Sequence, residues 1–370
     1  MLLTLWVFGT SEGIAHASVL AERCRRDDAY RWVCGGQAPS ERTLSSFRRD
    51  NLALFESVFR QVIASLRSEG LIELTVIAQD GTRVRASAGV DSYRRLPSVM
   101  SALEEANARL VEVRAQAHDM TKSKIARAAA ERGARERVER LERAATTLRA
   151  LQAAREVTDE EMAVMKGAPR VSTTDPEAVR MKMPDGGFRP AYNVQFATTA
   201  DAAKAIVGVD VLASGNDFGQ LDPMRAKVEA TTGETPQAWL ADGGYAKKAD
   251  IEAMAAANIA TYTPEPKKKP DPQKRTAREQ SAAMVEHAER IASPEGKALY
   301  ALRGETAELS NAHAKSRFGM SVLTMRGLAG ALITATLVSL TTDAIVLIRE
   351  RRKHEATTTN VAVNSAPSRA

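Results

Sequence analysis

Three acidic residues of this chain occur in settings that suit metal-dependent phosphoryl transfer. Asp80 and Asp242 each follow an apolar run and precede a glycine. Glu308 lies in a stretch with helical spacing, seven positions before Lys315. Two aspartates at strand ends and a glutamate on a later helix are the residue types that two-metal phosphoryl transfer uses. We therefore interpret Asp80, Asp242 and Glu308 as the catalytic, metal-binding acids.

The chemistry explains why no histidine is needed. Two divalent ions roughly 3.5–4 Å apart neutralise the attacking and the leaving oxygen. Mg²⁺, or Mn²⁺ in its place, prefers oxygen ligands, so three carboxylates suffice for two ions. The alternative for each aspartate taken alone is an ordinary turn residue. The five histidines of the chain show no zinc spacing, and no phosphate-binding or dinucleotide-binding glycine motif is present.

Glu308 is a better candidate than Glu305 because of helical geometry. Seven residues make almost two full turns, so Glu308 and Lys315 share one helix face, and Asn311 lies on it too. A lysine there can hold a substrate phosphate beside a metal-bound carboxylate. The alternative is a plain surface ion pair between Glu308 and Lys315.

The elements that must position these acids change along the chain. Helical spacing covers residues 1–70, and residues 71–90 predict a hairpin whose turn is Asp80-Gly81. Residues 96–165 are rich in Ala, Arg, Glu and Leu and predict one long helix or a helical hairpin. This insertion is either a solvated coiled segment or a surface for dimerisation or for the DNA backbone.

From residue 170 the pattern becomes α/β. We expect strands at 192–198, 205–212, 237–241 and 259–262, and helices at 220–231, 249–257, 294–317 and 326–349. Residues 264–274 predict a solvated loop, because four prolines and four lysines fall there. The fold class expected is α/β, a mixed sheet flanked by helices. The units are residues 1–70, 71–95 with Asp80, the insertion 96–168, the remaining catalytic domain 169–350, and a disordered tail 351–370.

The N-terminal region carries basic residues that suit DNA. Arg42, Arg48 and Arg49 lie with several hydroxyl residues in or beside one short helix that we expect to begin near Ser40. The alternative is a helical bundle with a solvated basic face. Lys182 and Arg189 flank a Gly-rich loop that either approaches a DNA backbone or is a structural turn.

General properties add weak constraints. The net charge of +6 and the pI of about 9.3 favour an anionic partner. Cys24 and Cys34 are too few for a disulfide framework, which indicates reduced cytosolic thiols. The apolar start has no basic flank and no cleavage site, so it does not predict a signal peptide. The apolar stretch 328–348 predicts a buried terminal helix, with a membrane anchor as the alternative that its flanking arginines keep open.

At these residues the chain resembles a bacterial insertion-sequence transposase of the DDE type, which has a ribonuclease H-like catalytic domain. The resemblance covers roughly residues 4–340. The phrases that carry it are Ser11–Gly13, Asp28–Gly36, Thr43–Arg48, Ala78–Ala88, Ser172–Ala178, Met181–Gln195, Asp242–Tyr245, Glu305–Lys315 and Met325–Leu328. It implies that Asp80 lies on the first strand of the sheet, that Asp242 follows the fourth, and that Glu308 is the helical third acid.

One branch of this family has a Tyr-x2-Arg-x3-Glu-x6-Lys motif, which is similar to Tyr300, Arg303, Glu308 and Lys315. Here the gap between Arg303 and Glu308 is one residue longer. On a regular helix this turns Arg303 away from the Glu308 face unless Gly304 loosens the helix. Family members also have a longer region before the match begins, so we expect this copy to be truncated at its N-terminus.

The sequence thus predicts a DNA transposase that binds terminal inverted repeats as a homo-oligomer and transfers strands into target DNA. Lys315, Arg303 and the basic residues above would contact DNA, and the protein would be cytoplasmic, on the nucleoid, without a membrane. One alternative is a truncated, non-catalytic relative that occupies the repeats and represses transposition. The other is a scaffold that assembles through 96–165 and is anchored by 328–348.

Overall fold

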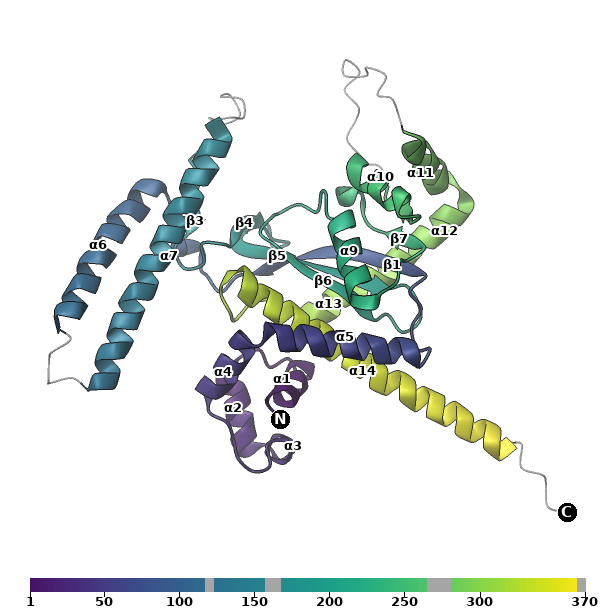
Figure 1. Cartoon of the computed structure of the whole chain (residues 1–370), viewed down its shortest axis with the longest axis horizontal. Helices are drawn as coiled ribbons and strands as arrows, with labels where there is room; N and C mark the ends of the chain where they lie inside the picture. Colours follow the sequence, from purple (N-terminus) through teal and green to yellow (C-terminus); the bar gives the residue numbers. More distant parts are fainter. Residues whose placement is uncertain (117–122, 157–167, 265–280, 365–370) are drawn as a thin grey trace.

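The computed structural model describes residues 1–116, 123–156, 168–264 and 281–364. A central sheet is surrounded by helices, a helical hairpin projects from one side, and four short N-terminal helices lie below (Figure 1). The expected α/β class is confirmed, because the sheet contains both parallel and antiparallel pairs. The loop expected at 264–274 lies outside the described residues after Pro264.

The sheet has the strand order β4-β5-β1-β7-β8, and β6 also pairs with β5. Its strands are β1 (Val76–Arg85), β4 (Val179–Lys182), β5 (Phe188–Thr199), β6 (Ile206–Leu212), β7 (Ala238–Leu240) and β8 (Ala260–Tyr262). β5 is antiparallel to β1, whereas β7 is parallel to β1 and β8 is parallel to β7. The strands predicted after residue 190 are therefore confirmed in position, with ends that differ by a few residues.

The hairpin predicted at residues 71–90 is wrong. β1 is one continuous strand, and Asp80 sits in its middle opposite Phe196 of β5. The glycine at position 81 makes no turn. A Cβ there would lie 2.2 Å from Nε2 of Gln195, so Gly81 is required by close side-chain packing across the strand pair. An Asp-Gly pair resembles turn chemistry in sequence, but here the glycine relieves crowding instead.

The N-terminal helices form a bundle of their own. They are α1 (Leu2–Ser11), α2 (Ala17–Arg26), α3 (Asp28–Val33) and α4 (Glu41–Asp50), followed by α5 (Leu52–Ser68). Ser40 caps α4 by accepting a hydrogen bond from the Thr43 amide, as the sequence predicted. Trp6 and Leu44 are fully buried in the bundle core, which also includes Leu337 from the last helix. Cys24 and Cys34 are free and buried.

The charged insertion is a helical hairpin, as one of the two sequence interpretations had it. α6 (Leu96–Ala115) packs against α7 (Lys124–Glu156) through an apolar seam that includes Val99, Leu141 and Leu148. A short antiparallel pair joins its base to the sheet region, between β2 (Tyr93–Arg94) and β3 (Val171–Ser172). The turn η1 (Val90–Ser92) precedes β2.

The remaining helices follow the strands from β6 onward. They are α9 (Leu221–Thr232), η3 (Gly243–Tyr245), α10 (Lys248–Ala256), α11 (Ala282–Ala292), α12 (Pro294–Arg303), η5 (Gly304–Glu308), α13 (Leu309–Ser316) and α14 (Gly327–Asn364). The helix expected at 294–317 is thus interrupted by η5, which is π-helical. The last helix does not end near 349 but continues to Asn364, so the disordered tail expected from 351 is helical over most of its length.

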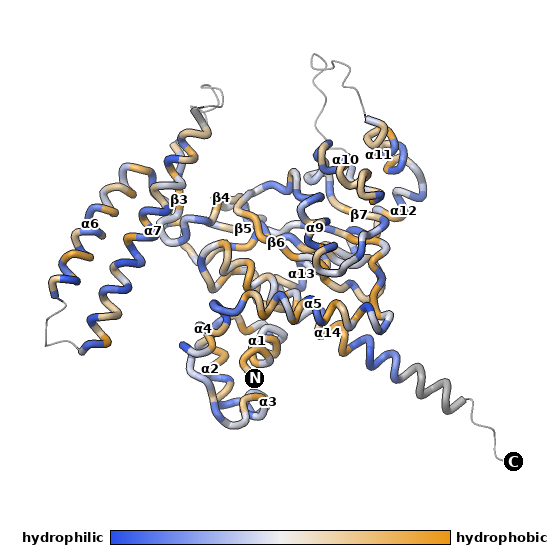
Figure 2. Tube along the Cα trace, viewed as in Figure 1, coloured by the Kyte–Doolittle hydropathy of each residue, from blue (hydrophilic) through white to orange (hydrophobic). Residues whose placement is uncertain are grey.

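The apolar part of α14 packs as a core helix. It is the one described helix that is long and apolar enough to cross a membrane, yet 61% of its most apolar window is buried inside the protein. Its Asp343 is fully buried and accepts a hydrogen bond from the Ile206 amide of β6 at 2.9 Å. Figure 2 shows the apolar part of α14 against the rest of the molecule and a short polar stretch directly after it. This packing favours the buried-helix interpretation over the membrane anchor.

Candidate active site

Asp80 and Asp242 are brought together by the parallel pair β1–β7. Ala78 pairs with Leu240, and each aspartate stands two positions further along its own chain. Side chains two apart on a strand share a face, so Asp80 points to the same face as Ala78, where Ala307 of η5 packs. Asp242 caps η3 and accepts a hydrogen bond from the Gly244 amide at 2.7 Å. Asp80 on β1 and Asp242 just after β7 therefore lie near each other, with η5 packed over the same face as Asp80.

The electrostatics of Asp80 reflect this crowding of acids. The pKa of Asp80 is raised to about 6, chiefly by burial. Arg303 and the Gly81 amide lower it, and the negative charges of Asp242 and Asp217 contribute to the rise. A carboxyl that keeps its proton unusually well, beside a second carboxyl, is typical of a site that binds a cation.

Glu308 contacts the site through an arginine. Arg303 places Nη1 3.8 Å from Oδ2 of Asp80 and Nη2 3.2 Å from Oε1 of Glu308. The carboxylates of Asp80 and Glu308 are therefore separated by the width of one guanidinium group. In the part of the chain that the structure describes, no three His, Cys, Asp or Glu side chains are grouped closely enough to hold a metal ion. The expectation that all three acids form one cluster is thus not met: the aspartates are together, and Glu308, whose side chain is 62% exposed, is held by Arg303.

The π-helical turn η5 explains how Arg303 reaches Glu308. Residues five apart do not align on an α-helix, but a π-turn has i→i+5 hydrogen bonds and adds one residue to the turn. η5 begins at Gly304 and ends at Glu308, so it absorbs the extra residue between Arg303 and Glu308. The sequence comparison required the helix to widen at Gly304 if Arg303 and Glu308 were to share a face, and the structure has a π-turn that begins there.

Two further side chains of α13 belong to the site. Asn311 donates a hydrogen bond from Nδ2 to Oδ2 of Asp80 at 3.0 Å, and its buried Oδ1 has no hydrogen-bond partner among the described residues. Lys315 is partly buried on the same helix, and burial lowers its pKa while the nearby charge of Asp80 raises it. The helix face that carries Glu308, Asn311 and Lys315 is therefore directed toward Asp80.

A polar layer lies beside Asp80 and was not predicted. Asp217 accepts hydrogen bonds from Asn193 at 2.7 Å and from Gln195 at 2.6 Å, and the Tyr245 hydroxyl donates to Gln195. Asp217 also lies where a Cβ on Gly81 would meet it, at 2.5 Å. The sequence did carry a signal for two of these residues. Asn193 and Gln195 are two positions apart and are polar residues within a buried strand, where polar side chains need hydrogen-bond partners. Asp217 itself lies in a loop and gave no such signal.

The predicted DNA-contacting residues are placed in different environments. Arg42 and Lys182 are exposed, whereas Arg49 pairs with Asp50 at 2.8 Å and Arg189 with Asp185 at 2.9 Å.

Arg48 requires a correction, because it is 5% exposed and is a core residue. Its guanidinium stacks on Trp6 at 4.1 Å and donates to the Ala15 carbonyl at 2.8 Å and to the Thr324 hydroxyl at 3.2 Å. Burial lowers its pKa to about 10. Arg48 ties the N-terminal bundle to the segment before α14 and presents no charge at the surface.

The residues at this site supply oxygen ligands for a divalent cation, but one of the three predicted acids is paired with an arginine. Asp80, Asp242 and the unpartnered Oδ1 of Asn311 supply oxygen atoms of the kind that Mg²⁺ or Mn²⁺ prefers. Glu308 is the exception, because Arg303 already neutralises it.

Comparison with known proteins adds one finding. Residues 1–50 match the family model of a transposase domain (DUF772), and the match ends with the last residue of α4. No curated protein and no solved structure matches the chain. The match supports a transposase family and a function in DNA processing, and it lies in the N-terminal helices rather than in the part that carries the acids.

Proposed function

We propose that the chain is a DDE-type transposase with a ribonuclease H-like catalytic domain, which binds terminal inverted repeats and catalyses DNA strand cleavage and strand transfer. The observation that carries the proposal is that Asp80 of β1 lies near Asp242, which directly follows the parallel strand β7, with Glu308 joined to Asp80 through Arg303. The transposase-domain match at residues 1–50 supports it from an independent part of the chain.

Asp80, Asp242 and Glu308 would hold two Mg²⁺ or Mn²⁺ ions. When bound, these ions would activate the attacking oxygen and neutralise the leaving oxygen of a phosphodiester. The chain itself would orient the acids: the Gly81 amide holds Asp80 at 2.9 Å, the Gly244 amide holds Asp242, and Asn311 positions the second oxygen of Asp80. Glu308 would join them after it leaves Arg303, and its exposed side chain leaves it free to do so.

The basic residues around the acids would bind the DNA. Lys315 lies near Asp80 on the face of α13 that leads to the site, which suits a phosphate beside the scissile bond. Arg303, once released from Glu308, would be a second phosphate contact. Arg42 and Arg49 of the N-terminal bundle, with Lys182 and Arg189 at the β4–β5 turn, would add salt-sensitive backbone contacts. The protein would act as a homo-oligomer on terminal repeats and target DNA, in the cytoplasm on the nucleoid.

A second candidate function is favoured by the pairing of Arg303 with Glu308. A relative that binds terminal repeats without cutting them would act as a repressor of transposition, and a permanent Arg303–Glu308 pair would keep it in that state. Both candidates bind DNA, and they differ in whether Glu308 takes part in cleavage.

Strand cleavage separates them. The substrate is a duplex that carries the sequences flanking the reading frame, with Mg²⁺ or Mn²⁺ and with chelator as a blank. The wild type should cleave only with the metal, and Asp80→Asn, Asp242→Asn and Glu308→Gln should each lose cleavage at least about 10³-fold while still binding the duplex.

The matched control is Glu305→Gln, because Glu305 is an exposed glutamate on the same π-turn that forms no ion pair with Arg303 among the described residues. This control should cleave like the wild type. Binding without cleavage by the wild type would favour the repressor, and full cleavage by any one acid variant would remove that residue from the site.

A further inference from the structure

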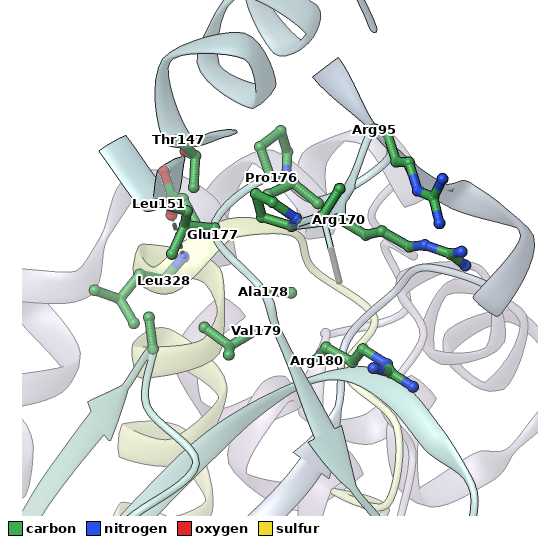
Figure 3. Close-up of a pocket in the computed structure, with 14 residues that line it drawn as sticks. Arg95, Thr147, Leu151, Arg170, Pro176, Glu177, Ala178, Val179, Arg180 and Leu328 are labelled. Carbon is green, nitrogen blue, oxygen red and sulfur yellow. Dashed lines mark hydrogen bonds between the residues drawn. The ribbon is translucent and has the colours of Figure 1, made fainter. Parts of the chain in front are cut away.

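A cavity separates the helical hairpin from the sheet, away from the acids. Its volume is about 810 Å³, and α7, the segment 168–180 and the start of α14 line it. Its floor is apolar, with Leu151, Val179 and Leu328. Figure 3 shows Arg95, Arg170 and Arg180 on the opposite side of the cavity, arranged in a row.

Three arginines at this cavity have no acidic partner among the described residues. Arg95, Arg170 and Arg180 are exposed, and within the described ranges no carboxylate forms an ion pair with any of them. Arg180 stacks on the partly exposed ring of Phe188 at 4.2 Å. Elsewhere on the hairpin, by contrast, Arg109, Arg114 and Arg135 are each paired with a glutamate.

The acids near the cavity are occupied in another way. Glu177, which lines it, accepts a hydrogen bond from the Leu328 amide at 2.5 Å, and Asp175 accepts from the Gly327 amide at 3.2 Å. Both therefore cap the first turn of α14, where unpaired amides carry partial positive charge. Their negative charge stabilises the helix and does not neutralise the arginines.

More positive charge continues along α7 toward α14. Arg140, Arg143 and Arg326 line a smaller neighbouring pocket. The Nε atom of Arg140 is buried with no hydrogen-bond partner among the described residues. Burial lowers the pKa of Arg140, and the charges of Arg326 and Arg143 lower it further while Glu136 raises it. Asp175 and Glu177 line the same pocket. Positive charge that is not neutralised within the protein is what a polyanion would neutralise.

We propose that this cavity is a second DNA-binding site, at which Arg95, Arg170 and Arg180 bind the phosphodiester backbone of a strand that then passes along Arg140 and Arg326. The inference rests on the proposed function, since it assigns a second contact to the same DNA. The proposal also selects one of the roles considered for residues 96–165: the base of this hairpin contacts the DNA backbone. Phosphate contacts position the DNA and carry no sequence information, so a duplex of any sequence is a valid probe.

The test measures the salt dependence of binding. A fluorescein-labelled 40-base-pair duplex of arbitrary sequence is titrated with the full chain at several salt concentrations. Each lost phosphate contact lowers the slope of log K against log salt by about 0.9, so the triple variant Arg95→Ala, Arg170→Ala, Arg180→Ala should lower the slope by about 2–3 and weaken binding about tenfold or more at low salt.

The matched control removes the same amount of charge from the helices of the hairpin. The triple variant Arg109→Ala, Arg114→Ala, Arg135→Ala loses three arginines that are already paired, and it should bind within about threefold of the wild type. A third variant with lysine at positions 95, 170 and 180 keeps the charge and should retain most of the affinity, which separates a charge effect from misfolding.

Three results would overturn the inference: equal losses in both alanine variants, no loss in the first, or an equal loss in the lysine variant. If the wild type cleaves DNA in the assay above and the first alanine variant binds normally, the second site fails while the proposed function stands. If the wild type shows no salt-sensitive binding at all, both fail together.

Discussion

The acid site and the arginine cavity balance their charges in opposite ways. Beside the middle of β1 and the end of β7, the acids are neutralised from within, because Arg303 bridges Asp80 and Glu308. At the base of the hairpin, three arginines face a cavity with no acid partner among the described residues. A site that is neutralised internally must exchange partners before it binds a ligand, whereas a site with unpaired charge can bind one directly. If the proposed function holds, we expect DNA backbone to bind the cavity first and the proposed catalytic acids to rearrange afterwards.

The largest expected effect on stability comes from a substitution at Gly81, which lies against the polar layer beside Asp80. Gly81→Ala places a Cβ about 2–3 Å from the side chains of Gln195, Asp217 and Asn193, where no Cβ fits. Buried overpacking costs about 1–3 kcal/mol, and disrupting the hydrogen bonds to Asp217 adds to it. Unfolding in urea should show a midpoint well below that of the wild type. An unchanged midpoint would mean that the β1–β5 pair has more room than the structure shows.

Asp80 should destabilise the fold at neutral pH. Its folded pKa of about 6 exceeds the ordinary aspartate value, so the folded state binds the proton more tightly than the unfolded state does. Stability is therefore lost as pH rises from about 4 to about 6 and stays reduced above that. Asp80→Asn should raise the unfolding free energy on the order of 1–3 kcal/mol at pH 8 and change it little at pH 4.

Thermal unfolding at the two pH values measures this difference. The matched variant is Asp185→Asn, an exposed aspartate whose pKa is lowered by Arg189, and it should not stabilise the protein at pH 8. If Asp80→Asn also fails to stabilise the protein at pH 8, nearby positive charge neutralises Asp80 more fully than the contacts of Arg303 indicate.

Arg303 tests the internal charge balance directly. Without it, Asp80 and Asp242 lose their nearest cation, and Glu308 loses its partner. Arg303→Gln should therefore bind Mg²⁺ more tightly than the wild type. A tenfold gain in affinity adds about 1.4 kcal/mol of stability at saturating metal, which a thermal shift with and without Mg²⁺ detects. A smaller metal-induced shift in the variant would show that Arg303 helps the metal rather than competing with it.

The smallest expected effect on stability comes from shortening the π-turn η5 by one residue. Deleting Gly304 brings Arg303 and Glu308 to a spacing of four, at which an ordinary α-helix keeps them on one face. The turn then needs no extra residue, and stability should change by no more than about 1 kcal/mol. Inserting an alanine at the same place should be markedly more damaging. Equal damage from the deletion and the insertion would mean that the π-turn does more than absorb one residue.

Much of the fold could be predicted because local chemistry determines it. The Ser40 cap, the strands β5 and β6 and the two helices of the insertion follow from capping, alternation and composition, each within a few residues. The candidate acids were chosen by residue type and, for Asp80 and Asp242, by the glycine that follows each, and their role stays a prediction. The misread turn at Asp80-Gly81 shows the limit: Gly81 is explained by Gln195, which lies 114 positions away in the chain.

The sequence by itself determined which elements form and which residue types could bind a metal, because helix and strand preferences act over a few neighbouring residues. Only the tertiary structure decided that Asp80 and Asp242 are adjacent, that Arg303 stands between Asp80 and Glu308, and that Arg48 is buried under Trp6. The physical reason is that charge balance and burial depend on which distant segments meet. An arginine has the same chemistry in an ion pair, in a core or at a cavity, and its surroundings alone decide what it does.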